Sequence, residues 1–249
     1  MNNVEKQAFL LLKKVNKAIR DYDMIADGDR IAVAVSGGND SLSLLRLLQF
    51  RQNFVRERYE LAAIHIIGDA HGPNDCQAHP PLVEWLAESG VEYVIEPMQI
   101  PEGEPLPLPC HRCTWNRRKT LFFTAQRLGC CKVAFGHHAD DIVETALLNL
   151  FYQGRMETME PCASYFGGIF FLIRPLIYLY KKELTQFAHP HLPPPPPVCP
   201  RRDTSRRKLM GDILRLAECR PLAEGVGERS EHVRNNVFKT AMRAMKVKG

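Results

Sequence analysis

The stretch Ile31-Ala-Val-Ala-Val-Ser36-Gly37-Gly38-Asn39-Asp40-Ser41 decides the fold. An apolar, β-branched run stops at a glycine turn, and leucines at helical spacing follow from Leu42 to Leu48. This order predicts a buried strand, a tight turn and the start of a helix. The glycines leave backbone N–H groups uncovered, and the helix start adds unpaired donors with a partial positive charge. The turn is therefore suited to bind a phosphate group.

Asp40 has a different role in this turn, because a carboxylate repels phosphate and is suited instead to Mg²⁺. The simpler alternative is an ordinary strand–turn–helix connection with a serine cap, but serines on both sides of the aspartate favour a phosphate site. The Walker A ending and the Rossmann glycine spacing are both missing. The motif resembles the pyrophosphate loop of the PP-loop ATPases, which adenylate a substrate and release pyrophosphate. Many thiolases of that group carry lysine at the position of Asn39.

Strand-like and helix-like segments alternate along the first two thirds of the chain. The apolar runs fall at residues 30–35, 59–67, 91–95 and 131–135, and helical patterns fall at residues 4–21, 41–52, 80–89 and 112–128. This alternation predicts an α/β fold with a doubly wound parallel sheet. We expect one ATP-binding domain over residues 1–189, with the phosphate loop at the carboxyl end of the first strand.

The C-terminal part differs in composition and charge. Residues 190–200 hold seven prolines and predict an extended linker, and residues 205–217 and 229–245 predict two basic helices. The segment from Cys199 to the end contains 13 Lys and Arg and 6 Asp and Glu. The preceding residues contain 20 Lys and Arg and 22 Asp and Glu. We therefore expect a small helical part over residues 190–249 that binds a polyanion, and tRNA is the obvious class. A solvated helical surface is the alternative.

Three cysteines stand out as metal ligands. Cys110 and Cys113 have the C-x-x-C spacing, and Cys199 lies in stiff, proline-rich chain. Three thiolates can hold an iron–sulfur cluster, whereas structural zinc needs a fourth ligand such as His111. A redox pair is the other alternative for the C-x-x-C. Cys130, Cys131 and Cys162 are expected to fill the core.

A second motif, Gly136-His-His-Ala-Asp140-Asp141, follows the fourth expected strand and opens a helix. Gly136 allows a close turn, and the two aspartates stand at a helix N-terminus, where negative charge is stabilised. Helix capping explains them without any ligand. The shared carboxyl edge of the sheet favours contact with ATP or Mg²⁺ instead, and the neighbouring histidines are placed to touch phosphate.

The combined motifs resemble one family, the tRNA 2-thiocytidine synthetases of the PP-loop group. The resemblance spans roughly Ala18 to Met245 and includes the segments Leu148–Gly154 and Ile173–Leu176. It implies the HUP fold (adenine nucleotide alpha hydrolase-like), with ATP and Mg²⁺ used to activate the C2 carbonyl of a tRNA cytidine. It also implies a 4Fe–4S cluster on Cys110, Cys113 and Cys199, with sulfur supplied by a cysteine desulfurase or another donor. The expected catalytic residues are Asp40 and Asp141. The expected nucleotide-binding residues are Ser36, Gly37, Gly38, Asn39, Asp40, Ser41, Gly136, His137, Asp140 and Asp141.

Two departures keep other functions open. Asn39 replaces the frequent lysine, and Cys199 is followed by Pro200 rather than by the second C-x-x-C of the family. The rivals are another PP-loop sulfur transferase or desulfidase, and a non-catalytic nucleotide- or RNA-binding module with structural zinc. No signal-peptide core and no membrane-length apolar run is present, so we expect a cytoplasmic protein without a membrane partner. The oligomeric state is left open, with a homodimer allowed for.

Overall fold

The computed structural model describes residues 3–69, 71, 78–188, 191–197, 199, 204–219 and 232–246. The chain forms two compact units. The first comprises Met1–His137 with Pro161–Arg202, and the second comprises His138–Glu160 with Asp203–Gly249. Residues 138–160, which the sequence analysis assigned to the ATP-binding domain, thus group with the C-terminal helices.

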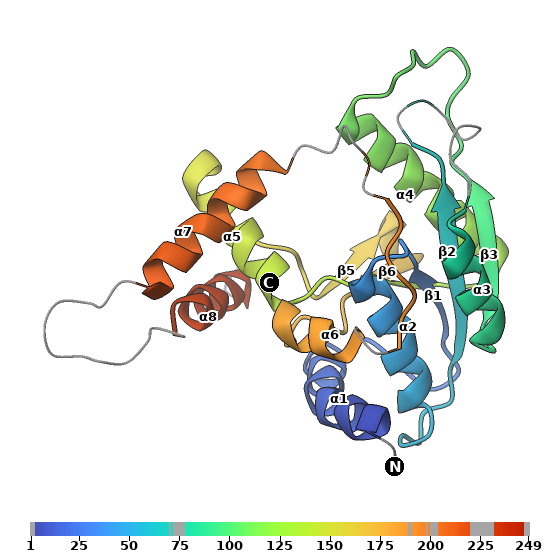
Figure 1. Cartoon of the computed structure of the whole chain (residues 1–249), viewed down its shortest axis with the longest axis horizontal. Helices are drawn as coiled ribbons and strands as arrows, with labels where there is room; N and C mark the ends of the chain where they lie inside the picture. Colours follow the sequence, from blue (N-terminus) through green and yellow to red (C-terminus); the bar gives the residue numbers. More distant parts are fainter. Residues whose placement is uncertain are drawn as a thin grey trace, which may run out of the picture. The chain divides into compact units, whose positions relative to one another are not determined.

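A six-stranded sheet forms the centre of the first unit (Figure 1). Its spatial order is β3-β2-β1-β4-β6-β5, and all neighbouring pairs are parallel except β5 with β6. The strands are β1 (Arg30–Ala34), β2 (Glu60–Ile67), β3 (Glu92–Pro97), β4 (Lys132–Ala134), β5 (Cys162–Tyr165) and β6 (Phe170–Ile173). The expected doubly wound α/β sheet is confirmed, with one antiparallel edge strand that the sequence analysis did not include.

The antiparallel edge has a local cause. A short 3₁₀ turn, Phe166–Gly168, joins β5 to β6, and both of its glycines have positive φ. A connection this short returns the chain beside itself, so the two strands pair as a hairpin.

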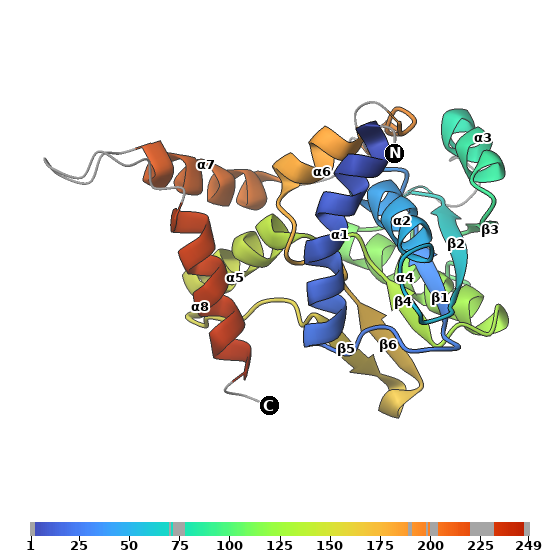
Figure 2. The same cartoon turned by 90° about the horizontal axis from the view of Figure 1, so that it is seen from below.

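The α-helices among the described residues of the first unit lie on the sheet and on one another. They are α1 (Asn3–Asp21), α2 (Asn39–Arg51), α3 (Pro80–Glu88), α4 (Cys110–Arg127) and α6 (Lys181–Ala188). Helices α1, α2 and α6 pack against one another, whereas α4 packs on β2 and β4 (Figure 2). The leucines of α2 from Leu42 to Leu48 are all fully buried, because this helix is covered both by β1 and by the neighbouring helices.

The strand order reverses at β1, and this reversal positions the site. The chain leaves β1 toward β2 on one side, while β4 pairs with β1 on the other side. The loops that follow β1 and β4 therefore emerge next to each other at the carboxyl edge, where open α/β sheets bind ligands.

The second unit is helical. It contains α5 (Ala139–Gln153), α7 (Ser205–Cys219) and α8 (His232–Lys246). Val143 and Leu147 of α5 pack with Met210 and Leu214 of α7, and apolar residues of α8 join this cluster. The two expected basic helices are confirmed, and their apolar faces pack on α5. Within the described residues, no helix combines the length and the hydrophobicity that a membrane crossing requires.

Candidate active site

The loop Ser36–Ser41 is held by its own two serines. The Ser41 hydroxyl accepts the Ser36 N–H at 3.1 Å and donates to the Gly38 carbonyl at 2.9 Å. The Ser36 hydroxyl accepts the Gly38 N–H at 3.3 Å. Gly37 has a φ of +84°, a conformation that favours glycine. Asn39 begins α2, and the preceding Gly38 caps the helix without a side chain. Because Gly38 has no side chain, no side-chain oxygen of the N-cap residue accepts the first N–H groups of α2. An anion can bind at such a helix N-terminus.

Gly136, in the loop after β4, lies directly against this phosphate loop. A Cβ at position 136 would lie 2.9 Å from the carbonyl carbon and oxygen of Asp40 and from the nitrogen of Ser41. No real Cβ tolerates such a contact with backbone atoms, so only glycine fits. The structure thereby brings together two motifs that are 95 residues apart in the sequence.

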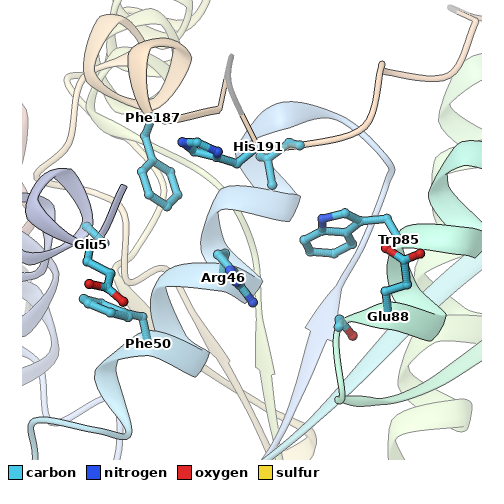
Figure 3. A pocket seen from close by; sticks show the side chains of 10 residues that line it. Glu5, Arg46, Phe50, Trp85, Glu88, Phe187 and His191 are labelled. Atoms are coloured by element: carbon cyan, nitrogen blue, oxygen red, sulfur yellow. The ribbon is translucent and has the colours of Figure 1, made fainter. Parts of the chain in front are cut away.

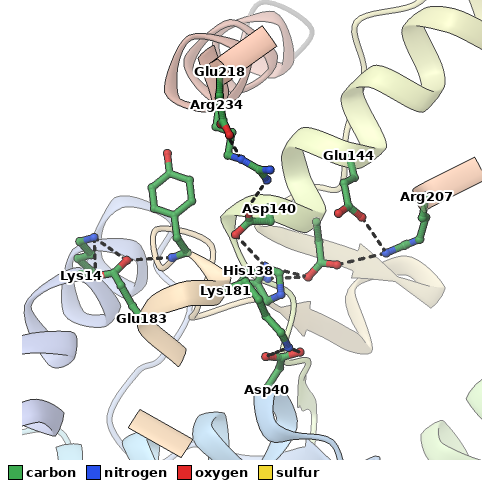
Figure 4. A network of polar contacts seen from close by, with 12 residues as sticks. Lys14, Asp40, His138, Asp140, Glu144, Lys181, Glu183, Arg207, Glu218 and Arg234 are labelled. Atoms are coloured by element: carbon green, nitrogen blue, oxygen red, sulfur yellow. Dashed lines mark hydrogen bonds and ion pairs between the residues drawn. The ribbon is translucent and has the colours of Figure 1, made fainter. Parts of the chain in front are cut away.

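Asp40 is paired with a lysine that the sequence analysis did not identify. Lys181, at the start of α6, places its Nζ 2.6 and 2.5 Å from the two carboxylate oxygens of Asp40 (Figure 4). Both side chains are partly exposed, at 48% for Lys181 and 28% for Asp40. The sequence around Lys181 has no motif that indicates a role at the phosphate loop. The packing of α6 on α2 is what brings Lys181 to Asp40. A cation beside the phosphate loop is suited to bind phosphate oxygens.

The proline segment packs over the other side of the loop. A Cβ at Gly37 would meet the Pro196 ring at 2.9 Å and the Leu82 side chain at 3.2 Å. The His79 Nε2 donates to the Pro194 carbonyl at 3.2 Å. Pro194 and Pro196, within the linker expected over residues 190–200, therefore pack in the first unit, and Pro196 lies against Gly37 of the phosphate loop.

His137 stands in the first unit, at the end of the loop that follows β4. Its ring stacks on Phe135, with centroids 5.6 Å apart, and its Nδ1 accepts a hydrogen bond from the Arg174 Nε at 3.2 Å. Arg174 is only 4% exposed. A neutral Nδ1 that accepts this bond leaves the proton on Nε2, which is then a hydrogen-bond donor.

The cysteines of the C-x-x-C occupy the first turn of α4. Cys110 is exposed, and Cys113 is half-buried against the core. Burial raises the pKa of the Cys113 thiol; Arg117 opposes this rise, and the nearby Cys199 and Asp69 add to it. Among the described residues, however, no three His, Cys, Asp or Glu side chains are arranged to hold a metal as they stand, so the three-cysteine site stays a prediction.

The other cysteines behave differently from one another. Cys130 is buried, as expected, and Cys162 is partly exposed. Cys131 is exposed, so its assignment to the core was wrong. Successive side chains of extended backbone point to opposite faces, so burial of Cys130 turns its neighbour outward. Cys76 lies outside the described residues.

Asp140 and Asp141 lie in the second unit, on the first turn of α5, and both carboxylates are engaged. The Arg234 Nη1 lies 2.6 Å from Asp140 (Figure 4). The Arg207 Nη1 lies 3.2 Å from Asp141. Asp141 also accepts the backbone N–H of His138 at 3.0 Å, which completes a capping box. The helix-capping interpretation of Asp141 is thus observed, while its catalytic role stays a prediction.

Comparisons with known proteins agree with this geometry. A family model described as a PP-loop domain matches residues 10–192. A tRNA-cytidine(32) 2-sulfurtransferase of Erwinia tasmaniensis is 38% identical, over 86% of this chain and 70% of that protein. The relative of the same name from Citrifermentans bemidjiense is 36% identical over 89% of both chains. The chain belongs to the tRNA-cytidine(32) 2-sulfurtransferase family.

A solved structure supports the fold of this sulfurtransferase-family chain. The U34-tRNA thiolase NcsA from Methanococcus maripaludis, solved with its 4Fe–4S cluster, superposes with a TM-score of 0.69. The superposition covers 96% of this chain and 80% of that chain at 21% identity. At this identity the match concerns the fold alone.

The first unit of this sulfurtransferase-family chain also contains a cavity that the phosphate loop does not line. This cavity of about 460 Å³ lies among α1, α2, α3 and α6, and Figure 3 shows Arg46, Phe50 and Trp85 around it. None of the site residues expected from the sequence lines this cavity.

Proposed function

We propose that the chain is an ATP-dependent tRNA thiolase that replaces the C2 oxygen of a tRNA cytidine with sulfur. The observation that carries this proposal is a phosphate loop held by its own serines and packed so closely against Gly136 that a Cβ there would lie 2.9 Å from Asp40, in a chain of the sulfurtransferase family. The names of the relatives place their target at cytidine 32, and we propose the same nucleotide here. The proposed compartment is the cytoplasm.

The proposed role of the phosphate loop is to bind the leaving pyrophosphate. A carbonyl oxygen is a poor leaving group. Its attack on the α-phosphorus of ATP forms a C2–O–P bond and releases pyrophosphate, and AMP then carries the oxygen away when sulfur bonds to C2. The N–H groups of Ser36–Ser41 and the start of α2 stabilise the charge of the pyrophosphate. Asp40 would turn from Lys181 to Mg²⁺, and Lys181 would then bind a phosphate oxygen. His137, which follows Gly136 in the loop after β4, is a further proposed phosphate-binding residue.

The donor set at α4 fits an iron–sulfur cluster. Thiolates are the ligands that such clusters use, and Cys110 and Cys113 supply two sulfur atoms from the first turn of α4. Cys199 is the third proposed ligand. When bound, a cluster with three protein thiolates supplies an iron without a protein ligand, where sulfur can bind. The proposed sulfur source is a cysteine desulfurase or another donor.

The second unit supplies exposed cations that suit tRNA phosphates. Arg206 and Lys208 of α7 are exposed, and the Arg206 guanidinium lies 4.8 Å from the centre of the Tyr152 ring. Arg201 and Arg202 belong to the same basic segment but lie outside the described residues. Phosphate contacts of this kind add affinity without sequence selectivity.

The test is tRNA-dependent cleavage of ATP by anaerobically purified protein. We expect AMP and pyrophosphate to form in equal amounts, and only when tRNA and a sulfur source are present. Asp40→Asn keeps the size of the side chain and should abolish this turnover. If the purified protein contains zinc and binds tRNA but cleaves no ATP, the chain is instead a non-catalytic RNA-binding module with structural zinc. An equal rate of ATP cleavage with and without tRNA would favour a PP-loop enzyme with a different substrate.

A further inference from the structure

Helix α4 carries a stripe of aromatic and cationic side chains directly after the C-x-x-C. Trp115 and Phe123 are 49% and 51% exposed, although both are large and apolar. The Lys119 Nζ lies between them in sequence and contacts both rings, at 5.5 Å from Trp115 and 5.7 Å from Phe123. Residues spaced by four share one face of a helix, so these three side chains form a continuous surface.

Arg112 fixes one end of this surface. Its guanidinium lies 4.9 Å from the centre of the Trp115 ring, and its Nε lies 2.5 Å from the Glu104 Oε1. The second oxygen of Glu104 accepts a hydrogen bond from Asn116 at 3.0 Å. The carboxylate thus anchors the guanidinium, and the guanidinium orients the indole. We name Arg112, Trp115, Lys119 and Phe123 the Trp115 stripe.

This arrangement has the two properties that single-stranded RNA requires. Exposed rings provide faces on which unpaired bases stack, and interleaved cations attract the phosphates that join those bases. The part of each ring that solvent reaches remains open to a ligand. An isolated exposed aromatic needs no explanation, but two aromatics that share one lysine on a single helix face form a patterned surface.

We propose that the Trp115 stripe is a docking surface for an unpaired base of a tRNA loop. This inference rests on the proposed function, because it takes the RNA to be the substrate of the same site. Trp115 follows Cys113 by two residues at the same end of α4, and the two side chains point to different sides of the helix. A base stacked on the indole would therefore leave a neighbouring nucleotide of the loop to reach the proposed sulfur site. The stripe would act by orienting the loop, whereas the cations of the second unit would supply general affinity.

The test measures binding of fluorescently labelled tRNA at several salt concentrations. Stacking does not release counterions, so Trp115→Leu should weaken binding about 5- to 150-fold at every salt concentration and leave the log–log salt slope unchanged. Lys119→Gln removes one phosphate contact and should reduce the slope by about 0.7, the single-strand value. Trp115→Phe keeps a ring and should retain most of the affinity.

A matched control separates stacking from a general loss of aromatic surface. Phe54→Leu removes a ring that is 51% exposed elsewhere in the first unit, and it should leave tRNA binding unchanged. A second readout uses 2-aminopurine in the tRNA loop, whose fluorescence should be quenched by the wild type and not by Trp115→Leu. Equal affinity and equal quenching for wild type and Trp115→Leu would overturn the inference. The proposed function fails separately, when wild-type protein binds tRNA but forms no AMP.

Discussion

Gly136 lies so close to Asp40 that a methyl group at position 136 would be 2.9 Å from the Asp40 carbonyl oxygen. Asp40 lies in the first turn of α2, which follows β1, and Gly136 lies in the loop that follows the adjacent parallel strand β4. This close approach packs the start of α2 against the loop after β4, in an interior where small volume changes are felt.

Gly136→Ala should therefore distort the phosphate loop. We expect the free energy of unfolding to fall by about 1–3 kcal/mol through overpacking, together with a loss of ATP binding. Calorimetric titration with ATP and thermal melting measure both effects. Gly211→Ala is the control, since nothing lies within 4 Å of a Cβ there and alanine favours a helix. A Gly136→Ala protein that binds ATP normally would show that the contact is dispensable.

Lys181→Met should impair ATP use with little effect on stability. The pair with Asp40 is partly exposed, so it stabilises the fold by about 1 kcal/mol or less. Loss of a charged contact to phosphate should raise the KM for ATP about 10- to 100-fold. Lys182→Met, the neighbouring exposed lysine, is the matched control. If both variants show the wild-type KM, Lys181 serves only to neutralise Asp40.

Replacing Cys110, Cys113 or Cys199 by alanine should each remove the iron. Anaerobic wild-type protein should be brown, with about four iron and four sulfide per chain. Cys131→Ser is the control, because Cys131 is exposed and is not one of the proposed ligands. Metal and sulfide analysis decides between the alternatives. Zinc without sulfide would refute the cluster, and iron retained without Cys199 would show that the third ligand is another residue.

His65 should make stability depend on pH. The His65 Nδ1 lies 2.8 Å from the carbonyl oxygen of Val35, next to the phosphate loop. Burial lowers the pKa of His65, and the positive charge of Arg117 lowers it further. The hydrogen bond to Val35 acts in the opposite direction and raises the pKa. The unfolded histidine, with a pKa of about 6.5, therefore takes up a proton before the folded one does. Below that pH the free energy of unfolding should fall, by at most about 1.4 kcal/mol per pH unit.

Urea unfolding between pH 7 and pH 5 measures this effect for wild type and for His65→Asn. The variant has no titrating ring, so its stability should decline less steeply over this range. Parallel slopes for the two proteins would rule out His65 as the source.

Much of the site could be predicted from the sequence because its signals are local. The glycine turn at Ser36–Ser41 and the C-x-x-C each carry their geometry within a few residues. The four-residue strands β5 and β6 were missed, since such short runs have no clear periodicity. Lys181 and Pro196 reach the phosphate loop only through tertiary packing, which leaves no trace in sequence spacing. For the same reason, the sequence could not reveal that α5 packs with α7 and α8.

The most direct test of the account is mass spectrometry of tRNA nucleosides from a strain that lacks this chain. We predict that 2-thiocytidine is absent from that strain and that wild-type protein restores it, whereas Asp40→Asn protein does not. If 2-thiocytidine persists in the deletion strain, or if another thiolated nucleoside is lost instead, the proposed function is contradicted.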